Sequence, residues 1–344
     1  MLVSGGALAA LLLASCSSPT SAAKPSASAP LSSNPAVTIG YENNGADPSM
    51  ITIHKGYFKK YLNSQVSLDL FSSGPVALSA IASGSLQFMC GIGLPPVISA
   101  IARGVPLAVV WNQERYTQDA GIVVTKSSGI TSLADLTGKT IAIDIGSESS
   151  FELPTLLAQK GIALSAVNQL NMTPPEMVSA WKTGQIEAAT VWDPDFNYLV
   201  AHGGRVLATD ASLPANATSF NICVANTKFV KAHPAAAVDF VKAMQAGVKY
   251  LHTNAASALK VMVSAAGITA ATARIELKGY QIYDLADQVT SSVLGHGSEI
   301  ATAGTTKSLT NNWKELYKQG FISVAPPSNM AKYVDPGPAK SALG

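Results

Sequence analysis

The chain has 344 residues, of which 47% are hydrophobic and only 13% charged, and its formal net charge is +2. This length accommodates one large domain or two medium ones. Beyond the N-terminus, no apolar run is as long as the roughly 18 residues that a membrane-spanning helix needs. No block of Lys or Arg is present, which excludes nucleic acid as an expected partner, because such binding normally needs a clustered basic surface.

The N-terminal segment has the composition of an export signal. Residues 1–15 form an apolar stretch that ends in small residues, as in a secretory signal peptide, although no Lys or Arg precedes it. The letters LASC, ending at Cys16, resemble the bacterial lipobox, in which the cysteine becomes the lipid-modified first residue of the mature protein. The alternative is an ordinary cleaved signal with an incidental cysteine. We expect residues 1–16 to be a lipoprotein signal, with Cys16 as a membrane anchor.

Residues 17–35 are rich in Ser, Ala and Pro. Such a segment cannot bury a core and is expected to be a disordered linker.

From residue 36, short apolar runs typical of strands alternate with helical stretches. The predicted strands are 36–41, 66–74, 86–93, 106–112 and 121–126. The predicted helices are 47–62, 75–84 and 95–104. The last two begin with Pro and end with Gly, which are start and stop signals of a helix. Alternation of this kind indicates parallel βαβ units.

The strand–helix pattern restarts near residue 132. The expected elements are a helix, turn and strand over 132–146, a helix at 150–161, a strand at 167–172, a helix at 174–185, and strands at 186–192 and 219–226. Helices follow at 233–252, 254–266, 269–283 and 305–319. We predict an α/β protein of two lobes, the first from residues 36–120 and 221–344 and the second from 121–220. Chain crossings near 118–124 and 218–226 would form a hinge.

Two further cysteines, Cys90 and Cys223, lie inside apolar strand-like runs. Three cysteines cannot form a disulfide framework. We expect buried free thiols rather than a mutual disulfide.

The loops that precede the predicted helices suggest a ligand site. Ligands of open α/β sheets bind outside the carboxyl ends of the strands. Several helices there start at Gly/Ser/Pro turns, whose N–H groups and helix dipoles can hold an anion without Arg or Lys. Trp192 directly follows a strand and could stack on a ligand or cover a cation. Carboxylates occur in the same loops, at Glu42, Asp47, Glu148, Asp193 and Asp195.

Each of those carboxylates taken alone is more typical of a helix cap or a solvated loop. Together with the helix starts, they indicate a small molecule that carries both charges. The sequence has no GxSxG, HExxH, P-loop or CxxC motif, and none of its five histidines falls in a recognisable catalytic motif. We therefore expect no catalysis, no metal and no cofactor.

Three stretches carry a family resemblance. They are GIVVTKSSGITSLADLTGKTIAIDIGSESSF (121–151), NMTPPEMVSAWKTGQIEAATVWDPDFNYL (171–199) and SGPVALSAIASGSLQFMCGIGLPPVISAIARGVPLAVV (73–110). They resemble periplasmic-binding-protein-like domains of the nitrate/sulfonate/taurine group, and the second is most similar to taurine-binding proteins. The resemblance spans about 36–325. It implies a two-lobed type II binding-protein fold and the solute-binding role in an ABC importer, whose partners are a permease and an ATPase.

The resemblance also implies site residues. It places a sulfonate cradle at Ser73, Gly74, Leu94, Ser147 and Ser149, and an aromatic wall at Trp192. A position that is acidic in taurine binders is Asn221 here, and Ser150 stands where the family often has His. Asp193 is therefore expected to meet an ammonium, with Glu42 or Asp47 as fallback partners.

The function expected from the sequence is a monomeric, lipid-anchored extracytoplasmic receptor for taurine or a related aliphatic sulfonate. One alternative is a receptor for another small solute, such as nitrate or a pyrimidine precursor. Another is a small-metabolite enzyme on the same fold, which would need a catalytic His, Cys or Lys at the cleft. A sensor domain is a third, but no signalling module follows.

Overall fold

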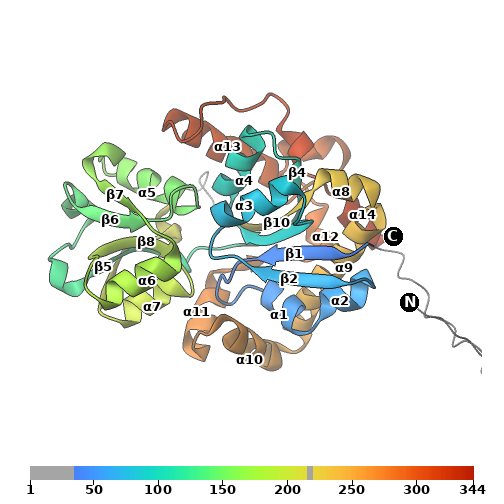
Figure 1. Cartoon of the computed structure of the whole chain (residues 1–344), viewed down its shortest axis with the longest axis horizontal. Helices are drawn as coiled ribbons and strands as arrows, with labels where there is room; N and C mark the ends of the chain where they lie inside the picture. Colours follow the sequence, from blue (N-terminus) through green and yellow to red (C-terminus); the bar gives the residue numbers. More distant parts are fainter. Residues whose placement is uncertain (1–34, 215–219) are drawn as a thin grey trace, which may run out of the picture. The chain divides into compact units, whose positions relative to one another are not determined.

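The computed structural model describes residues 35–214 and 220–344 (Figure 1). The predicted signal peptide, Cys16 and nearly all of the predicted linker lie outside the described residues. The described part is organised around two β-sheets with helices packed against them.

The first sheet has six strands in the order β11-β4-β10-β3-β1-β2. Their bounds are β1 (Val37–Tyr41), β2 (Val66–Leu70), β3 (Phe88–Ile92), β4 (Leu107–Arg115), β10 (Phe220–Asn226) and β11 (Gln281–Ile282). Strand β1 runs parallel to β2 and β3, whereas β10 is antiparallel to both β3 and β4. A strand from the second half of the chain thus completes a sheet begun by the first half.

The second sheet has five strands in the order β7-β6-β8-β5-β9. Their bounds are β5 (Ala120–Thr125), β6 (Thr140–Ile143), β7 (Asn168–Asn171), β8 (Ala188–Trp192) and β9 (Gly204–Thr209). Because β4 continues to Arg115 and β5 begins at Ala120, residues 116–119 link the two sheets. Most of both predicted hinge ranges, 118–124 and 218–226, therefore lies in strands.

The α-helices are α1 (Ser49–His54), α2 (Tyr57–Leu62), α3 (Gly74–Ser83), α4 (Leu94–Ala102), α5 (Ser149–Ala158), α6 (Pro174–Lys182), α7 (Asp195–Ala201), α8 (Thr227–Ala232), α9 (Pro234–Thr253), α10 (Ala255–Ala266), α11 (Ala270–Gly279), α12 (Leu285–Gln288), α13 (Gly304–Lys318) and α14 (Gly337–Leu343). Short 3-10 helices are η1 (Lys126–Ser128), η2 (Leu133–Leu136), η3 (Leu164–Ala166), η4 (Asp210–Ser212), η5 (Gly297–Thr302) and η6 (Met330–Tyr333).

Local signals account for where the helices begin and end. Helix α3 has Pro in its first turn and ends at Gly84, whose φ of 79° is left-handed. Helix α6 starts with a capping box between Thr173 and Glu176. The single helix predicted over 47–62 is divided instead, because Gly56 takes a φ of 68° between α1 and α2.

The helix predicted over 269–283 ends earlier, at Gly279. The next residues form β11, which pairs with the extended end of β4. This sheet contact is long-range, and helical spacing alone could not reveal it. In the described residues no single helix is long and apolar enough to span a membrane, although α10 and α11, bent by 107°, meet the criteria as a pair.

The first sheet is buried on both faces. Successive residues of β3 alternate between faces, so Met89 packs in one hydrophobic core with α3, α4 and α13. Phe88 packs in the other core, where its ring stacks on Phe240 of α9 with centroids 4.1 Å apart. Strand β5 of the second sheet alternates in the same way, with Ile122 in one core and Val123 in another. These two-sided cores hold the strand ends in fixed positions.

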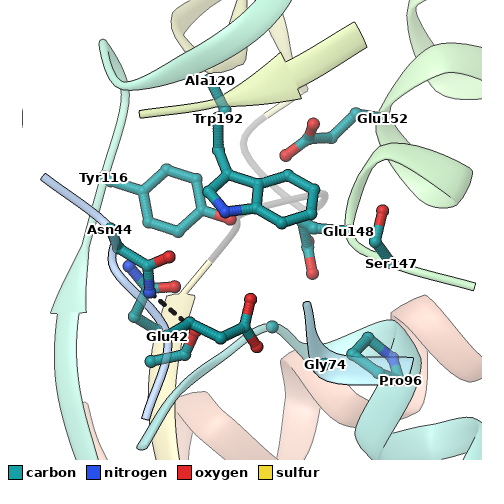
Figure 2. Close-up of a pocket in the computed structure, with 13 residues that line it drawn as sticks. Glu42, Asn44, Gly74, Pro96, Tyr116, Ala120, Ser147, Glu148, Glu152 and Trp192 are labelled. Carbon is teal, nitrogen blue, oxygen red and sulfur yellow. Dashed lines mark hydrogen bonds between the residues drawn. The ribbon is translucent and has the colours of Figure 1, made fainter. Parts of the chain in front are cut away.

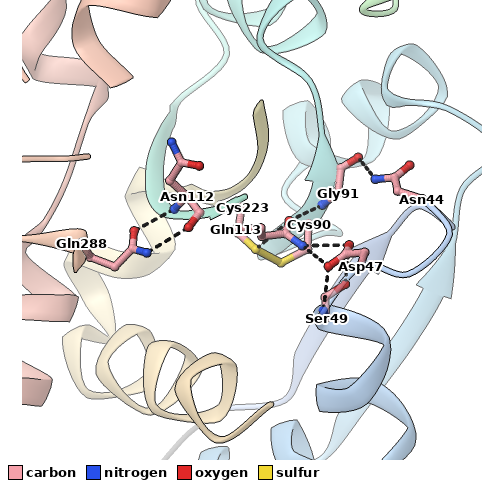
Figure 3. Close-up of a disulfide and its surroundings, with 9 residues drawn as sticks. All are labelled: Asn44, Asp47, Ser49, Cys90, Gly91, Asn112, Gln113, Cys223 and Gln288. Carbon is pink, nitrogen blue, oxygen red and sulfur yellow. Dashed lines mark hydrogen bonds between the residues drawn. A yellow bond between two sulfur atoms is a disulfide. The ribbon is translucent and has the colours of Figure 1, made fainter. Parts of the chain in front are cut away.

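Cys90 and Cys223 form a disulfide, so the prediction of free thiols was wrong (Figure 3). The two residues are 133 positions apart in the sequence, yet β3 and β10 are neighbours in the sheet and their Cα atoms lie 4.1 Å apart. Both side chains are buried. The sequence analysis did not predict that β10 pairs with β3. This pairing is what brings the two cysteines within bonding distance.

Candidate functional site

A narrow cavity lies where several strands end and helices begin (Figure 2). The space that a water molecule can occupy in it is about 30 Å³, and the empty space is about 340 Å³ when the open mouth is counted. The lining residues come from elements of both sheets and from the link between them: Glu42, Asn44, Gly74, Gly91, Gly93, Pro96, Tyr116, Ala120, Ser147, Glu148, Glu152, Trp192 and Asn221. This is the location at which open α/β sheets bind ligands.

Five of the ten predicted ligand-binding residues line this cavity: Glu42, Gly74, Ser147, Trp192 and Asn221. They come from the ends of β1 and β8, the starts of α3 and α5, and β10. The structure thus brings together residues that are up to 179 positions apart, from 42 to 221. Their roles in binding stay predictions.

The other five predicted residues, Asp47, Ser73, Leu94, Ser149 and Asp193, are buried outside the lining of this cavity. Two of them are carboxylates held by internal hydrogen bonds. Asp47 accepts hydrogen bonds from the Ser49 N–H and hydroxyl, both at 2.7 Å, and from Gln113 Nε2 at 2.8 Å (Figure 3). This geometry gives Asp47 a structural role at the start of α1.

Asp193 accepts hydrogen bonds from the backbone N–H of Asn197, at 2.8 Å, and from its side-chain amide. It lies in the turn before α7, and burial followed by the nearby Glu276 raises its pKa well above the usual range. The cavity therefore gives no support to Asp193 as an ammonium partner. Of the expected acidic partners, Glu42 is the one that lines the cavity.

Tyr116 and Glu152 line the cavity but were not predicted as site residues. Tyr116 lies in the link after β4, four residues beyond the end of the predicted strand, which stopped at 112. Glu152 is in the first turn of α5. Glu152 could have been found from the sequence, because an acid in the first turn of a helix at a strand end lies near the cleft.

Carboxylates dominate the polar lining. Glu42, Glu148 and Glu152 line the cavity, and no Lys, Arg or His does so among the residues that the structure describes. Glu42 is 4% exposed, and burial, followed by repulsion from Asp144, raises its pKa well above the usual value. Burial is also the main cause of a raised pKa at four further acids near the link between the sheets: Glu114, Asp119, Asp210 and Glu276.

Two carboxylates lie close to the backbone near the cavity. Gly93 precedes α4, and a Cβ there would collide with Glu148 Oε2, so the Glu148 carboxylate lies against the start of that helix. The Ala46 N–H donates to Glu276 Oε2 at 2.6 Å. Two acidic side chains of the protein itself thus lie against the backbone here, one of them hydrogen-bonded to it.

Two aromatic side chains complete the lining. Both the Trp192 indole and the Tyr116 ring line the cavity (Figure 2). The faces of such rings attract cations and pack against apolar groups. These rings suit the cavity to a small organic molecule. Among the described residues no group of His, Cys, Asp and Glu has the arrangement of a metal site.

The arrangement of two α/β sheets with a cavity at their strand ends is that of periplasmic binding proteins. An alkanesulfonate-binding protein from Xanthomonas axonopodis pv. citri, solved with MOPS bound, superposes with a TM-score of 0.72 at 20% identity and covers 87% of this chain and 98% of that one. An aliphatic sulfonate-binding protein from Escherichia coli superposes with a TM-score of 0.65 at 22% identity and covers 87% of this chain and 97% of that one. A desulfurization enzyme also superposes, with a TM-score of 0.62 at 13% identity, so this fold supports both binding and catalysis.

The chain belongs to the NMT1/THI5-like family, whose profile matches residues 45–258. The taurine-binding periplasmic protein of Escherichia coli (strain K12) is 29% identical over 206 residues, which are 60% of this chain and 63% of that protein. A putative aliphatic sulfonates-binding protein of Bacillus subtilis (strain 168) is 28% identical over 216 residues, or 62% and 64% of the two chains. The match thus covers less than two thirds of these relatives.

Proposed function

We propose that the chain is the extracytoplasmic solute-binding subunit of an ABC importer and that it holds one small organic solute in the cavity. The observation that supports this most is the cavity itself, which is built by strand ends of both sheets. The family and the names of the relatives support the same role. The expected partners are a permease and an ATPase, and the receptor is expected to act as a monomer.

The relatives make taurine and aliphatic sulfonates the first solutes to test. Of these, taurine suits the cavity better, because its ammonium can meet the Glu42 carboxylate. An alkanesulfonate without an amine would bring only a negative charge to a lining that holds three carboxylates.

The proposed compartment is outside the cytoplasmic membrane. The buried Cys90–Cys223 disulfide supports it, because structural disulfides persist in oxidising compartments and are rare in the cytosol. A lipid on Cys16 would keep the receptor near its permease. Closure of the two lobes around the link at 116–119 is part of the proposal.

The test combines two measurements. Mass spectrometry under native conditions would identify a solute that purifies with the protein, and calorimetry would then measure its affinity. Recovery of the solute with unchanged mass after incubation supports a receptor, whereas its conversion would indicate an enzyme. A protein that neither carries nor binds any small solute would contradict the proposal.

A further inference from the structure

We infer that the cavity selects its solute by positive charge: it takes an organic cation, such as a primary amine or a quaternary ammonium, and needs no sulfonate. This inference rests on the proposed function, since it concerns the same site. Taurine is then a limiting case, in which the ammonium provides recognition and the sulfonate is tolerated.

The first support is the state of Glu42. Its side chain is 4% exposed, and Oε1 is buried without a hydrogen-bond partner. The carboxyl group points into the cavity (Figure 2). A buried polar atom without a partner is unfavourable, and an ammonium in the cavity would satisfy it.

The second support is the sign of the surrounding charge. Glu148 and Glu152 line the same space, and its lining includes no basic side chain among the described residues. The Glu148 carboxylate lies against Gly93 at the start of α4, and the next residues of that helix include Pro95 and Pro96, which have no N–H to donate to an anion. A sulfonate at this helix start would therefore meet a carboxylate and few backbone donors.

The third support is the aromatic lining. Trp192 and Tyr116 border the cavity, and ring faces bind ammonium groups. Glu42 and Trp192 also border an adjoining groove of about 750 Å³, opening included. The lining of that groove includes the apolar side chains of Leu70, Phe71, Pro174 and Pro175, together with the polar Asn43, Ser72 and Asp195. The shape suits a solute whose charged end enters the cavity and whose apolar part lies in the groove.

The experiment is calorimetry on the full mature chain with four matched compounds. Taurine carries both groups, isethionate has a hydroxyl in place of the ammonium, and choline and 2-phenylethylamine carry a positive charge without a sulfonate. We expect isethionate to bind at least tenfold more weakly than taurine, and at least one of the two sulfonate-free cations to bind as tightly as taurine or more tightly.

A variant pair locates the effect. Glu42→Gln keeps the shape of the side chain but removes its charge, and should weaken binding of the cation about tenfold or more. The matched control is Glu299→Gln, since Glu299 is an exposed carboxylate in η5 that pairs with His296. It should leave the affinity unchanged. A thermal melt should show that Glu42→Gln remains folded, because the substitution removes a buried carboxyl group.

The outcomes separate this inference from the proposed function. If isethionate binds as tightly as taurine and neither cation binds, or if the solute that purifies with the protein is an anion or uncharged, the cation inference is overturned while the receptor role stands. Equal cation affinity in Glu42→Gln and the unmodified protein also overturns it. If no compound binds and no solute purifies with the protein, both proposals fail.

Discussion

Removing the Cys90–Cys223 disulfide should lower the free energy of unfolding by several kcal/mol. The bond joins residues 133 positions apart, and the chain-entropy relation for a loop of that length gives about 5 kcal/mol at 25 °C. Native disulfides typically contribute about 2–5 kcal/mol when removed. We expect a loss of about 3–5 kcal/mol, because the bond also holds β10, the returning strand, against β3.

The assay is urea unfolding followed by tryptophan fluorescence, on the oxidised protein and on the double variant Cys90→Ala/Cys223→Ala. Both sulfurs are buried in the core that contains Phe88 and Phe240, so part of any loss will come from the small voids that alanine leaves. The control is the unmodified protein, unfolded, reduced and refolded under reducing conditions, which keeps both side chains but lacks the bond.

If the reduced protein and the double variant both unfold within about 0.5 kcal/mol of the oxidised protein, the reasoning is refuted. That result would mean that the unfolded chain is not restricted by the bond, or that the bond does not form. A loss in the double variant alone would assign the effect to packing rather than to the cross-link.

Three further predictions concern acidity, anchoring and closure. Burial is the first cause of a raised pKa at nine carboxyl groups, among them Asp195 at about 6. The folded state therefore holds more protons than the unfolded state above about pH 4, and its stability should decrease as these groups lose their protons. The melting temperature of the ligand-free protein should fall as pH rises from 5 to 8, and a rise would contradict the assignment. Cys16→Ala should abolish labelling by a clickable fatty acid in cells, and unchanged labelling would remove Cys16 as the lipid site. Small-angle scattering should show compaction when the solute saturates the receptor, and an unchanged radius of gyration would count against closure.

The sequence contained most of the local structure. Some signals affect only the few residues around them. Examples are the Pro and Gly at the two ends of α3 and α6, and the apolar runs that form β3 and β8. Such signals can be interpreted without the rest of the fold. Gly56, which divides the helix predicted over 47–62, is also local, and its left-handed backbone could have been anticipated from the amino acid alone.

The pairing of distant segments could not be predicted in the same way. The disulfide depends on β10 lying between β3 and β4, and the end of the last predicted helix depends on β11 joining β4. Both are contacts between residues more than 100 positions apart, such as Cys90 and Cys223. Hydrophobic spacing shows that a strand is buried, but it does not show which strand lies beside it.

The site shows a similar division. The loops at strand ends were located, but the orientation of each acid depends on its internal partners. Asp47 and Asp193 face hydrogen-bond donors of their own loops and helices, whereas Glu42 faces the cavity. Glu152 reaches the lining from the first turn of α5, a position that the sequence alone could have indicated.

The buried acids connect the stability of this protein with its recognition of a solute. A carboxylate taken out of water is unfavourable unless it is protonated, hydrogen-bonded or paired with a positive charge. Asp47 has internal donors, and Glu276 accepts a backbone N–H. Glu42 is buried with an oxygen that lacks such a partner and turns toward the cavity. Burial raises the pKa of Glu42, so in the empty cavity this group is stabilised by holding a proton. The cavity lining includes no basic side chain among the described residues, so an ammonium group that replaces this proton would come from the solute, and binding would then offset the cost of the buried charge.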